Sequence, residues 1–259
     1  MPIPRLVKDI ATGDTVFGPQ DLTALGNLLY FTAEDGISGR ELWKSDGTAA
    51  GTVRVRDIKN GNSSSFRDED ENQLTVVGST LFFVAKDDLH GRELWKSDGT
   101  EAGTVLVKDI HSGDEDSDPA NLMLFGNTLY FRADDGSSGM ELWKSDGTET
   151  GTQRVKNINP GSVGSFPYGL TGVGNTLYFV AFDSDSGEEL WKTNGTEAGT
   201  VRVKDIHTDF MGAYPEYLTV MGNTLYFTAD DMLGRGRELW KSDGTEVGTD
   251  IVKDINSDY

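Results

Sequence analysis

A short apolar segment recurs along the chain and predicts a β-strand each time. It has the form Thr-Leu-Tyr-Phe-x-Ala, as in Thr128–Ala133, so successive positions on both sides of an extended strand are apolar. Aromatic and β-branched residues in such a run are typical of strands that are covered on both faces. A Gly-Asn pair precedes the segment, and these residues tolerate the positive φ angles of a two-residue hairpin turn. The pattern therefore predicts an antiparallel strand pair.

A second strand pair follows each of these segments. The sequence Glu-Leu-Trp-Lys ends at Ser-Asp-Gly-Thr, as in Glu141–Thr148, and Asp-Gly favours a tight turn. Another extended segment then runs into Val-Lys-Asp-Ile, as in Gly199–Ile206. No stretch of the chain shows helical periodicity. Each unit of this pattern thus predicts four short antiparallel strands.

The pattern is a repeat. The eight-residue string occurs five times, with Thr193 and Asn194 as departures in the fourth copy, at Glu41–Thr48, Glu93–Thr100, Glu141–Thr148, Glu189–Thr196 and Glu238–Thr245. The tryptophans are spaced by 52, 48, 48 and 49 residues. A period of this size with only strands indicates a propeller. We predict an all-β fold, a five-bladed β-propeller with four antiparallel strands per blade. Residues 1–259 form a single domain whose blades span 11–58, 59–110, 111–158, 159–206 and 207–255.

The two ends of the repeat array raise a question of closure. Val-Lys-Asp-Ile and its variants occur six times, whereas the tryptophan string occurs five times, so the copy at Val7–Ile10 is spare. We predict residues 4–10 to be an extra closing strand. Asp250–Ile255 is expected to be the outer strand of the fifth blade. Either copy can close the ring, and the other is then peripheral.

The repeated string also carries a resemblance. Five copies of Glu-Leu-Trp-x-x-Asp-Gly-Thr make the chain resemble the bacterial ELWxxDGT repeat proteins over essentially its whole length. The resemblance implies a β-propeller-type repeat protein that is secreted or held at the cell surface, and it implies no particular activity. The Asp-Gly hairpin resembles the Asp-box turn of sialidase-type propellers, where the turn is structural. The five-blade arrangement is similar to tachylectin-type lectins in architecture only.

Charge and composition narrow the classes of partner. The formal net charge is −20, which argues against nucleic acid as a partner because phosphate binding needs a Lys- and Arg-rich surface. No apolar run is long enough for a membrane span of about 18 residues. Met1–Arg5 lacks the apolar core of a signal peptide, and a start within a repeat favours a trimmed, extracellular chain over a cytosolic one. We expect a monomer that binds a glycan or an extracellular protein.

One aspartate recurs in the second loop of every unit, two residues after the Ala that ends the Thr-Leu-Tyr-Phe-x-Ala segment. These are Asp35, Asp87, Asp135, Asp183 and Asp231. Carboxylates gathered on one face could hold Ca²⁺, which takes six to eight oxygen ligands. Each Asp could instead accept hydrogen bonds from the N–H groups of its own loop. No segment has EF-hand or repeat-in-toxin spacing, so both interpretations remain, with calcium as the candidate cofactor.

The between-blade loops carry the least repetitive residues, and several are aromatic. Phe166, Tyr168, Tyr214 and Tyr217 are the predicted ligand-binding residues. Exposed rings beside Asp and Asn would give a carbohydrate an apolar platform with hydrogen-bonding groups around it. The alternative is that each ring is wedged between blades beside a proline such as Pro167 or Pro215.

The other repeated residues indicate structure rather than catalysis. The five Trp are expected to form the core between blades. The five Glu two positions before them are expected to pair with Arg or Lys of a neighbouring blade. A glycosidase needs two carboxylates in unlike environments, and no carboxylate here stands out from the repeat. We therefore predict a non-catalytic binding protein. The alternatives are a structural or designed repeat scaffold without a ligand, and a glycoside hydrolase.

Overall fold

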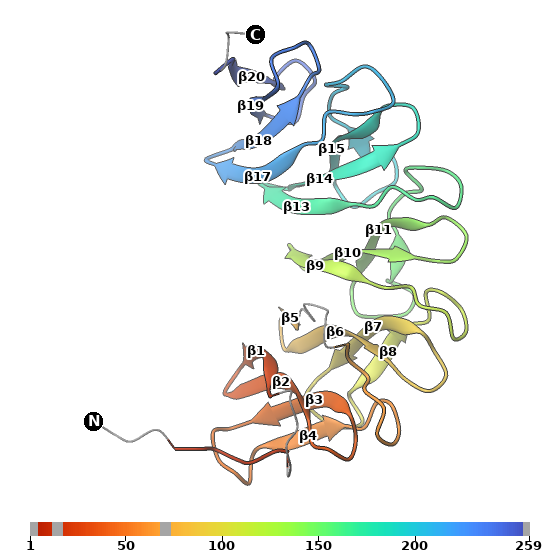
Figure 1. Cartoon of the computed structure of the whole chain (residues 1–259), viewed down its shortest axis with the longest axis vertical. Helices are drawn as coiled ribbons and strands as arrows, with labels where there is room; N and C mark the ends of the chain where they lie inside the picture. Colours follow the sequence, from red (N-terminus) through yellow and green to blue (C-terminus); the bar gives the residue numbers. More distant parts are fainter. Residues whose placement is uncertain (1–4, 12–17, 68–73, 256–259) are drawn as a thin grey trace. The chain divides into compact units, whose positions relative to one another are not determined.

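The computed structural model describes residues 5–11, 18–67 and 74–255 of the chain. Within these residues, all regular secondary structure is β-strand, and it forms five four-stranded antiparallel sheets (Figure 1). This strand content is consistent with a five-bladed β-propeller. The all-β fold class predicted from the repeat is confirmed.

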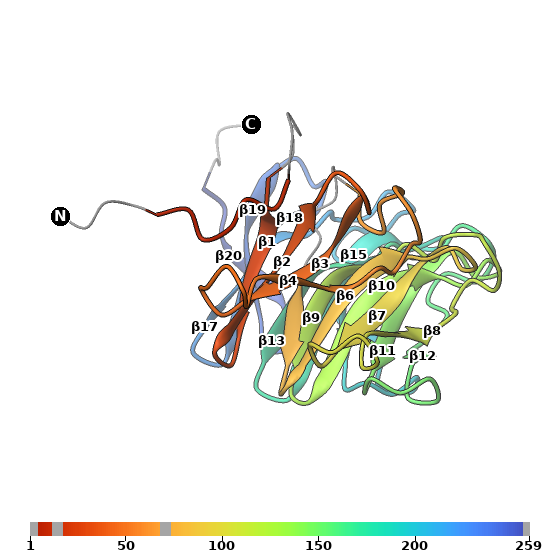
Figure 2. The same ribbon diagram turned by 90° about the horizontal axis from the view of Figure 1, so that it is seen from below.

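In every sheet the four strands are adjacent in the order in which they occur along the chain. The first sheet contains β1 (Gln20–Leu25), β2 (Leu28–Glu34), β3 (Arg40–Ser45) and β4 (Val53–Arg56), and these strands lie side by side in Figures 1 and 2. The second contains β5 (Thr75–Val77), β6 (Thr80–Lys86), β7 (Arg92–Ser97) and β8 (Val105–Lys108). The third contains β9 (Ala120–Phe125), β10 (Thr128–Asp134), β11 (Met140–Ser145) and β12 (Gln153–Arg154). The fourth contains β13 (Tyr168–Val173), β14 (Thr176–Asp183), β15 (Gly187–Thr193) and β16 (Val201–Arg202). The fifth contains β17 (Glu216–Met221), β18 (Thr224–Asp230), β19 (Arg237–Ser242) and β20 (Asp250–Lys253).

The predicted turns are present, and glycine explains why they close. In the Gly-Asn hairpin between the first two strands of a sheet, the glycine has a φ of +61° at Gly26 and +62° at Gly126. The glycine of Ser-Asp-Gly-Thr has a φ of +87° at Gly47, Gly99 and Gly147. Positive φ angles cost glycine little because it has no Cβ. The sequence therefore sets both hairpins of each sheet locally.

The chain divides into two compact units, Met1–Leu124 with Gly147–Glu149, and Phe125–Asp146 with Thr150–Tyr259. In the first unit, Tyr30, Leu42 and Val55 of the first sheet, with Ile58 just beyond β4, pack against Leu81, Phe83 and Trp95 of the second. In the second unit, the equivalent residues Tyr178, Leu190, Val203 and Ile206 pack against Leu225, Phe227 and Trp240. The same residue types thus form the core between sheets in both units.

The tryptophans lie where the repeat pattern predicted. All five are buried, with Trp191 the most exposed at 7%. Trp95 and Trp240 belong to the two inter-sheet cores described above. The expectation of a core between sheets is confirmed for these two residues, whereas Trp43 packs against Phe31 and Ala33 of its own sheet and against Ile10.

The fourth strands are shorter than the sequence suggested. Gly199–Ile206 was expected to be extended throughout, but β16 contains only Val201–Arg202. The N–H of Val203 still bonds to the Leu190 carbonyl oxygen at 2.8 Å. Beyond it, the Ile206 N–H donates to Oε2 of Glu189 at 3.2 Å. Ile58, Ile110 and Ile255 donate in the same way to the glutamate of their own sheet, so a side-chain carboxylate accepts the backbone N–H just beyond each of these fourth strands.

The first and last Val-Lys-Asp-Ile copies differ in structure. Asp250–Lys253 forms β20, the outer strand of the fifth sheet. Arg5–Ile10 forms no strand, and residue 4 lies outside the described residues. Ile10 nevertheless packs against Phe31, Ala33 and Trp43 of the first sheet. The N-terminal copy is therefore held against a sheet without joining one.

Candidate functional site

Two loops of the second unit bring two of the predicted ligand-binding tyrosines to Glu188, at the start of β15. The Tyr168 hydroxyl donates to Oε2 of Glu188 at 3.1 Å and to the Pro215 carbonyl oxygen at 3.4 Å. The Tyr214 backbone N–H donates to the Glu188 carbonyl oxygen at 3.1 Å. Glu188 therefore fixes both the loop that enters β17 and the first residue of β13.

An ion pair borders the same place. Arg237 Nη1 donates to the Tyr214 carbonyl oxygen at 2.7 Å and lies 3.3 Å from Oε2 of Glu216. Both charged side chains are partly exposed. Tyr217 follows Glu216 in β17 and is 77% exposed. We call Tyr168, Tyr214 and Tyr217, with Glu188, Glu216 and Arg237, the tyrosine surface.

Two of these tyrosines are held in an unfavourable backbone conformation. Tyr214 has a φ of +48° and Tyr217 a φ of +57°. The left-handed region costs a residue with a Cβ about 1–2 kcal/mol. The positions equivalent to Tyr217 in other repeats also have positive φ, and they hold Asp21, Asn121 and Gly169. Those residue types adopt the conformation at least cost. The fifth repeat thus places an exposed aromatic ring where its backbone favours a small residue.

The predicted aromatic residues do not all behave alike. Burial, reinforced by the neighbouring carboxylate of Glu188, raises the pKa of Tyr168 above its usual range, so its hydroxyl stays a neutral donor. Tyr214 is 38% exposed, and Phe166 is 47% exposed with a φ of +47° in the loop before β13. The contacts around Glu188 do not include Phe166. In the first unit Phe66 is buried against Phe83, so there the wedge interpretation holds.

The five predicted metal-binding aspartates each cap their own loop. Asp35 Oδ1 accepts the N–H of Ile37 at 2.9 Å and that of Ser38 at 2.8 Å. Burial opposes ionisation of Asp35, but these hydrogen bonds outweigh it and lower its pKa. The same hydrogen-bonding pattern occurs, with one or two N–H donors, at Asp87, Asp135, Asp183 and Asp231. These contacts are those of the turn-capping alternative.

Each of these aspartates also faces a basic side chain. The partners lie 2.6–3.7 Å away and are Arg54 for Asp35, His90 for Asp87, Arg154 for Asp135, Arg202 for Asp183 and Arg235 for Asp231. Among the residues that the structure describes, no group of three or more His, Asp or Glu side chains could hold a metal ion. The contacts favour the turn role, and calcium binding stays a prediction.

A polar cavity of about 350 Å³ in the second unit contains one of these aspartates. Its walls include Asp183 and Asp185, together with Lys156 and Arg202. Arg202 also lies 3.1 Å from Asp205. Because the cations already balance the carboxylates, the cavity is poorly suited to a further metal cation.

The five repeated glutamates are structural, but their partners are not the predicted cations. Glu41 is fully buried, and it accepts hydrogen bonds from Ile58 N at 3.0 Å and from Ser65 Oγ at 2.8 Å. Burial raises the pKa of Glu41 to about 8, although these hydrogen bonds oppose the rise. A carboxyl group that is sealed in this way cannot reach a substrate. Sequence reasoning missed the serine partner, although Ser65, Ser117 and Ser165 all follow their Glu by 24 residues.

The histidines also have local structural contacts. His90 Nδ1 lies 3.0 Å from Asp87 Oδ2, and His207 Nδ1 lies 3.1 Å from the Gly212 carbonyl oxygen. His111 donates its backbone N–H to Oε1 of Glu93 at 3.0 Å. These contacts account for each histidine without a catalytic role, and the prediction of a non-catalytic protein remains a prediction.

Comparisons with known proteins concern the fold. No family model and no curated protein sequence matches the chain. A puromycin-hydrolysing peptidase of Mycobacterium tuberculosis matches with a TM-score of 0.49 and 13% identity, over 90% of this chain and 37% of that one. Oligopeptidase B of Leishmania major matches with a TM-score of 0.48 and 14% identity, over 92% and 33%. TolB of Acinetobacter baumannii matches with a TM-score of 0.43 and 13% identity, over 89% and 55%.

These are likenesses of fold at low identity. The chain spans only about a third to a half of the length of those three proteins. What those proteins act on therefore says nothing about this one. In the part of the chain that is described, no helix is long and apolar enough to cross a lipid bilayer.

Proposed function

We propose that the protein is a non-catalytic, extracellular binding protein of the ELWxxDGT repeat type that recognises glycans through the tyrosine surface. The observation that supports this most is the exposed ring of Tyr217 at a left-handed backbone position. Strained residues persist where the surrounding structure holds them, and they concentrate at functional sites. A small residue would adopt this backbone conformation at a lower cost in stability, so we assign the ring a role in binding rather than in folding.

The chemistry of the surface fits a neutral sugar. A tyrosine ring offers a flat apolar face to sugar C–H groups, while its hydroxyl can bond to a sugar hydroxyl. Glu216 supplies acceptor oxygens beside Tyr217, and Arg237 supplies donors. Glu188 and the net charge of −20 disfavour sialylated or sulfated chains. Neutral glycans are therefore the proposed ligand class.

A glycan array probed with the labelled protein tests this proposal. We expect binding to neutral glycans that Tyr217→Asn weakens at least tenfold and that Tyr217→Phe largely keeps, because the second variant retains the ring. Asn is the residue at the equivalent position of the third repeat, so the change should not disturb the backbone. Leu233→Asn, which alters another exposed apolar residue, in the loop between β18 and β19, is the matched control.

The same array decides between the alternatives. Repeating it with a chelator tests the calcium-assisted form of the proposal. Binding that Tyr217→Asn leaves unchanged would place the ligand elsewhere on the protein. An array with no binding by the unmodified protein would favour a repeat scaffold without a glycan ligand.

A further inference from the structure

The sequence contains two Asn-Gly pairs, Asn60-Gly61 and Asn194-Gly195. In such a pair the backbone nitrogen of the glycine can attack the side-chain carbonyl carbon of the asparagine. A C–N bond forms, the bond to the side-chain amide nitrogen breaks, and ammonia leaves with the proton of the glycine N–H. Water then opens the cyclic imide to an aspartate or an isoaspartate. Glycine favours the attack because it has no Cβ and rotates freely.

The fold blocks this attack at Asn194-Gly195, in the second unit. The Gly195 N–H donates to Thr193 Oγ1 at 2.9 Å, so the attacking nitrogen is held in the turn. Asn194 Oδ1 accepts the Thr196 N–H at 3.0 Å and the Thr196 hydroxyl at 2.7 Å, which fixes the side-chain amide. Gly195 is buried, and a Cβ there would lie 2.5 Å from the Tyr130 hydroxyl oxygen. Neither reacting group can therefore approach the other.

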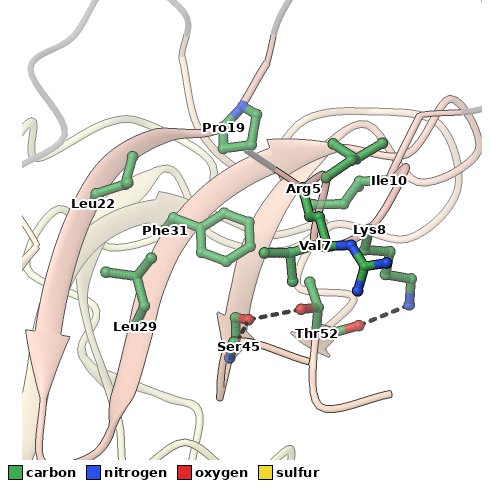
Figure 3. A pocket seen from close by; sticks show the side chains of 12 residues that line it. Arg5, Val7, Lys8, Ile10, Pro19, Leu22, Leu29, Phe31, Ser45 and Thr52 are labelled. Atoms are coloured by element: carbon green, nitrogen blue, oxygen red, sulfur yellow. Dashed lines mark hydrogen bonds between the residues drawn. The ribbon is translucent and has the colours of Figure 1, made fainter. Parts of the chain in front are cut away.

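These restraints belong to the turn that every repeat forms. In the first sheet the Gly47 N–H donates to Ser45 Oγ at 3.0 Å, and the Ser45 hydroxyl pairs with that of Thr52 at 2.7 Å (Figure 3). Asp46 occupies the position of Asn194, and its Oδ1 accepts the N–H and the hydroxyl of the turn threonine at 2.9 and 2.7 Å. An aspartate thus makes the same contacts as Asn194, so conversion there would leave the turn intact.

The pair Asn60-Gly61 lies in the loop between β4 and β5 and lacks these restraints. Both residues are exposed in the first unit. Within the described part of the chain, the Gly61 N–H has no hydrogen-bond partner. Gly61 has a φ of +85°, and a Cβ placed on it would have no other atom within 4 Å. The glycine nitrogen is therefore free to reach the Asn60 side chain.

Among the described residues, Asp88 is what holds Asn60. Its Oδ2 accepts the Asn60 backbone N–H at 3.3 Å and also accepts a hydrogen bond from the Asn60 side-chain amide. Both residues belong to the first unit, and Asp88 lies in the loop between β6 and β7. The contact is exposed, and water competes for the same groups, so it opens readily. Conversion of Asn60 would replace the amide donor with a second carboxylate, which Asp88 repels.

We propose that Asn60-Gly61 is a site of spontaneous deamidation in the folded protein, and that the modification separates the β4–β5 loop from the β6–β7 loop. The reaction needs water and no other reactant. It is irreversible, so the modified fraction increases with the age of the molecule. Asn194-Gly195 is protected by its turn. The proposal is independent of glycan binding, because the tyrosine surface lies in the second unit.

Peptide mapping by mass spectrometry, after incubation of the folded protein in mildly alkaline buffer, tests the first part. We expect Asn60 to convert at least tenfold faster than Asn194. In concentrated urea the two rates should become similar, because unfolding removes the restraints on Asn194. The proposal is overturned if Asn60 converts no faster than Asn194 in the folded protein, or if the difference persists in urea.

Hydrogen exchange of the Asn60→Asp variant tests the second part, because this variant carries one of the two reaction products. We expect faster exchange in the β4–β5 and β6–β7 loops than in the unmodified protein. Adding Asp88→Asn should restore slow exchange, since the new amide can donate to the new carboxylate. Asn194→Asp is the matched control and should leave the exchange of its own turn unchanged. Loops that exchange equally in Asn60→Asp and the unmodified protein would refute the separation.

Discussion

The Ser65 hydroxyl donates a hydrogen bond to Oε2 of Glu41 at 2.8 Å, and both groups are sealed from solvent. Ser117 and Glu93, and Ser165 and Glu141, form the same pair at 2.6 Å. Each pair joins the third strand of a sheet to the loop that leads to the next sheet. A buried carboxylate with this many donors makes the connection rigid.

Removing the serine from such a pair should lower stability. Ser165→Ala leaves the buried Glu141 carboxylate without one of its donors, which costs about 1–3 kcal/mol of unfolding free energy. Urea unfolding followed by tryptophan fluorescence measures this loss. Ser162→Ala, in the exposed part of the same loop, should have no measurable effect. Equal stability of the two variants would contradict the structural role of the pair.

The buried glutamates predict an unusual dependence of stability on pH. Burial raises the pKa of Glu41 and of Glu189 from 4.5 to about 8, and that of Glu93 to about 7. The folded protein therefore binds more protons than the unfolded chain between these values, so stability falls as pH rises toward 8. In acid the aspartates act in the opposite direction, because hydrogen bonds lower the pKa of Asp35 and Asp135.

Urea midpoints measured from about pH 4 to pH 9 should thus show a maximum near pH 5 and a decline from there to about pH 8, where they level off. Glu41→Gln, which is neutral at every pH, should make the decline shallower. A midpoint that is constant from about pH 5 to pH 9 would show that the glutamates stay ionised in the folded protein.

The loop that presents Tyr214 depends on a close backbone approach. A Cβ at Gly212 would overlap the Glu188 backbone, and the φ of Gly212 is +81°. Gly212→Ala should therefore displace Tyr214 and lower stability by more than about 2 kcal/mol, since strain and overlap act together. Gly234→Ala has a similar φ of +86° with open space around it, so it isolates the strain alone. Thermal melts of the two variants compare the effects.

The aspartate loops predict that calcium has little influence on stability. Each Asp already accepts backbone N–H groups and faces an arginine or histidine, as Asp135 does with Arg154 at 2.7 Å. We expect millimolar calcium to leave the melting temperature unchanged. A rise that a chelator reverses would show binding to the folded form, and it would support the calcium prediction.

Local signals in the sequence predicted the fold well. The Gly-Asn and Asp-Gly turns depend on φ angles that few residues adopt, so Gly26 and Gly47 mark them without tertiary information. The tryptophans were predicted as core from their size alone. The hydrogen bond that Glu189 accepts from the Ile206 N–H beyond β16 was not foreseeable in this way. Such a contact joins residues that only the folded chain brings together.

The candidate site was predicted less completely. Phe66 and Tyr214 are aromatic residues at equivalent positions of the segments between sheets, yet Phe66 is buried and Tyr214 is 38% exposed. Their sequence context does not separate them, since the outcome depends on which neighbouring side chains fill the adjacent sheet. The position of Tyr217 beside a bulge in β17 was equally hidden, because the equivalent residues Asp21 and Asn121 are polar.

The link between Glu41 and Ser65 has a practical meaning for anyone who wishes to lengthen, shorten or shuffle this array. A cut after Ile58, where the sequence repeat ends, would separate the Glu41 carboxyl group from the Ser65 hydroxyl. The transferred repeat would then carry a buried carboxyl group that lacks one of its hydrogen-bond donors. The transferable piece instead overlaps its successor, from Gln20 through Ser65. Splices made within the exposed hairpins between the first two strands of a sheet, such as Gly126-Asn127, would keep every such link intact.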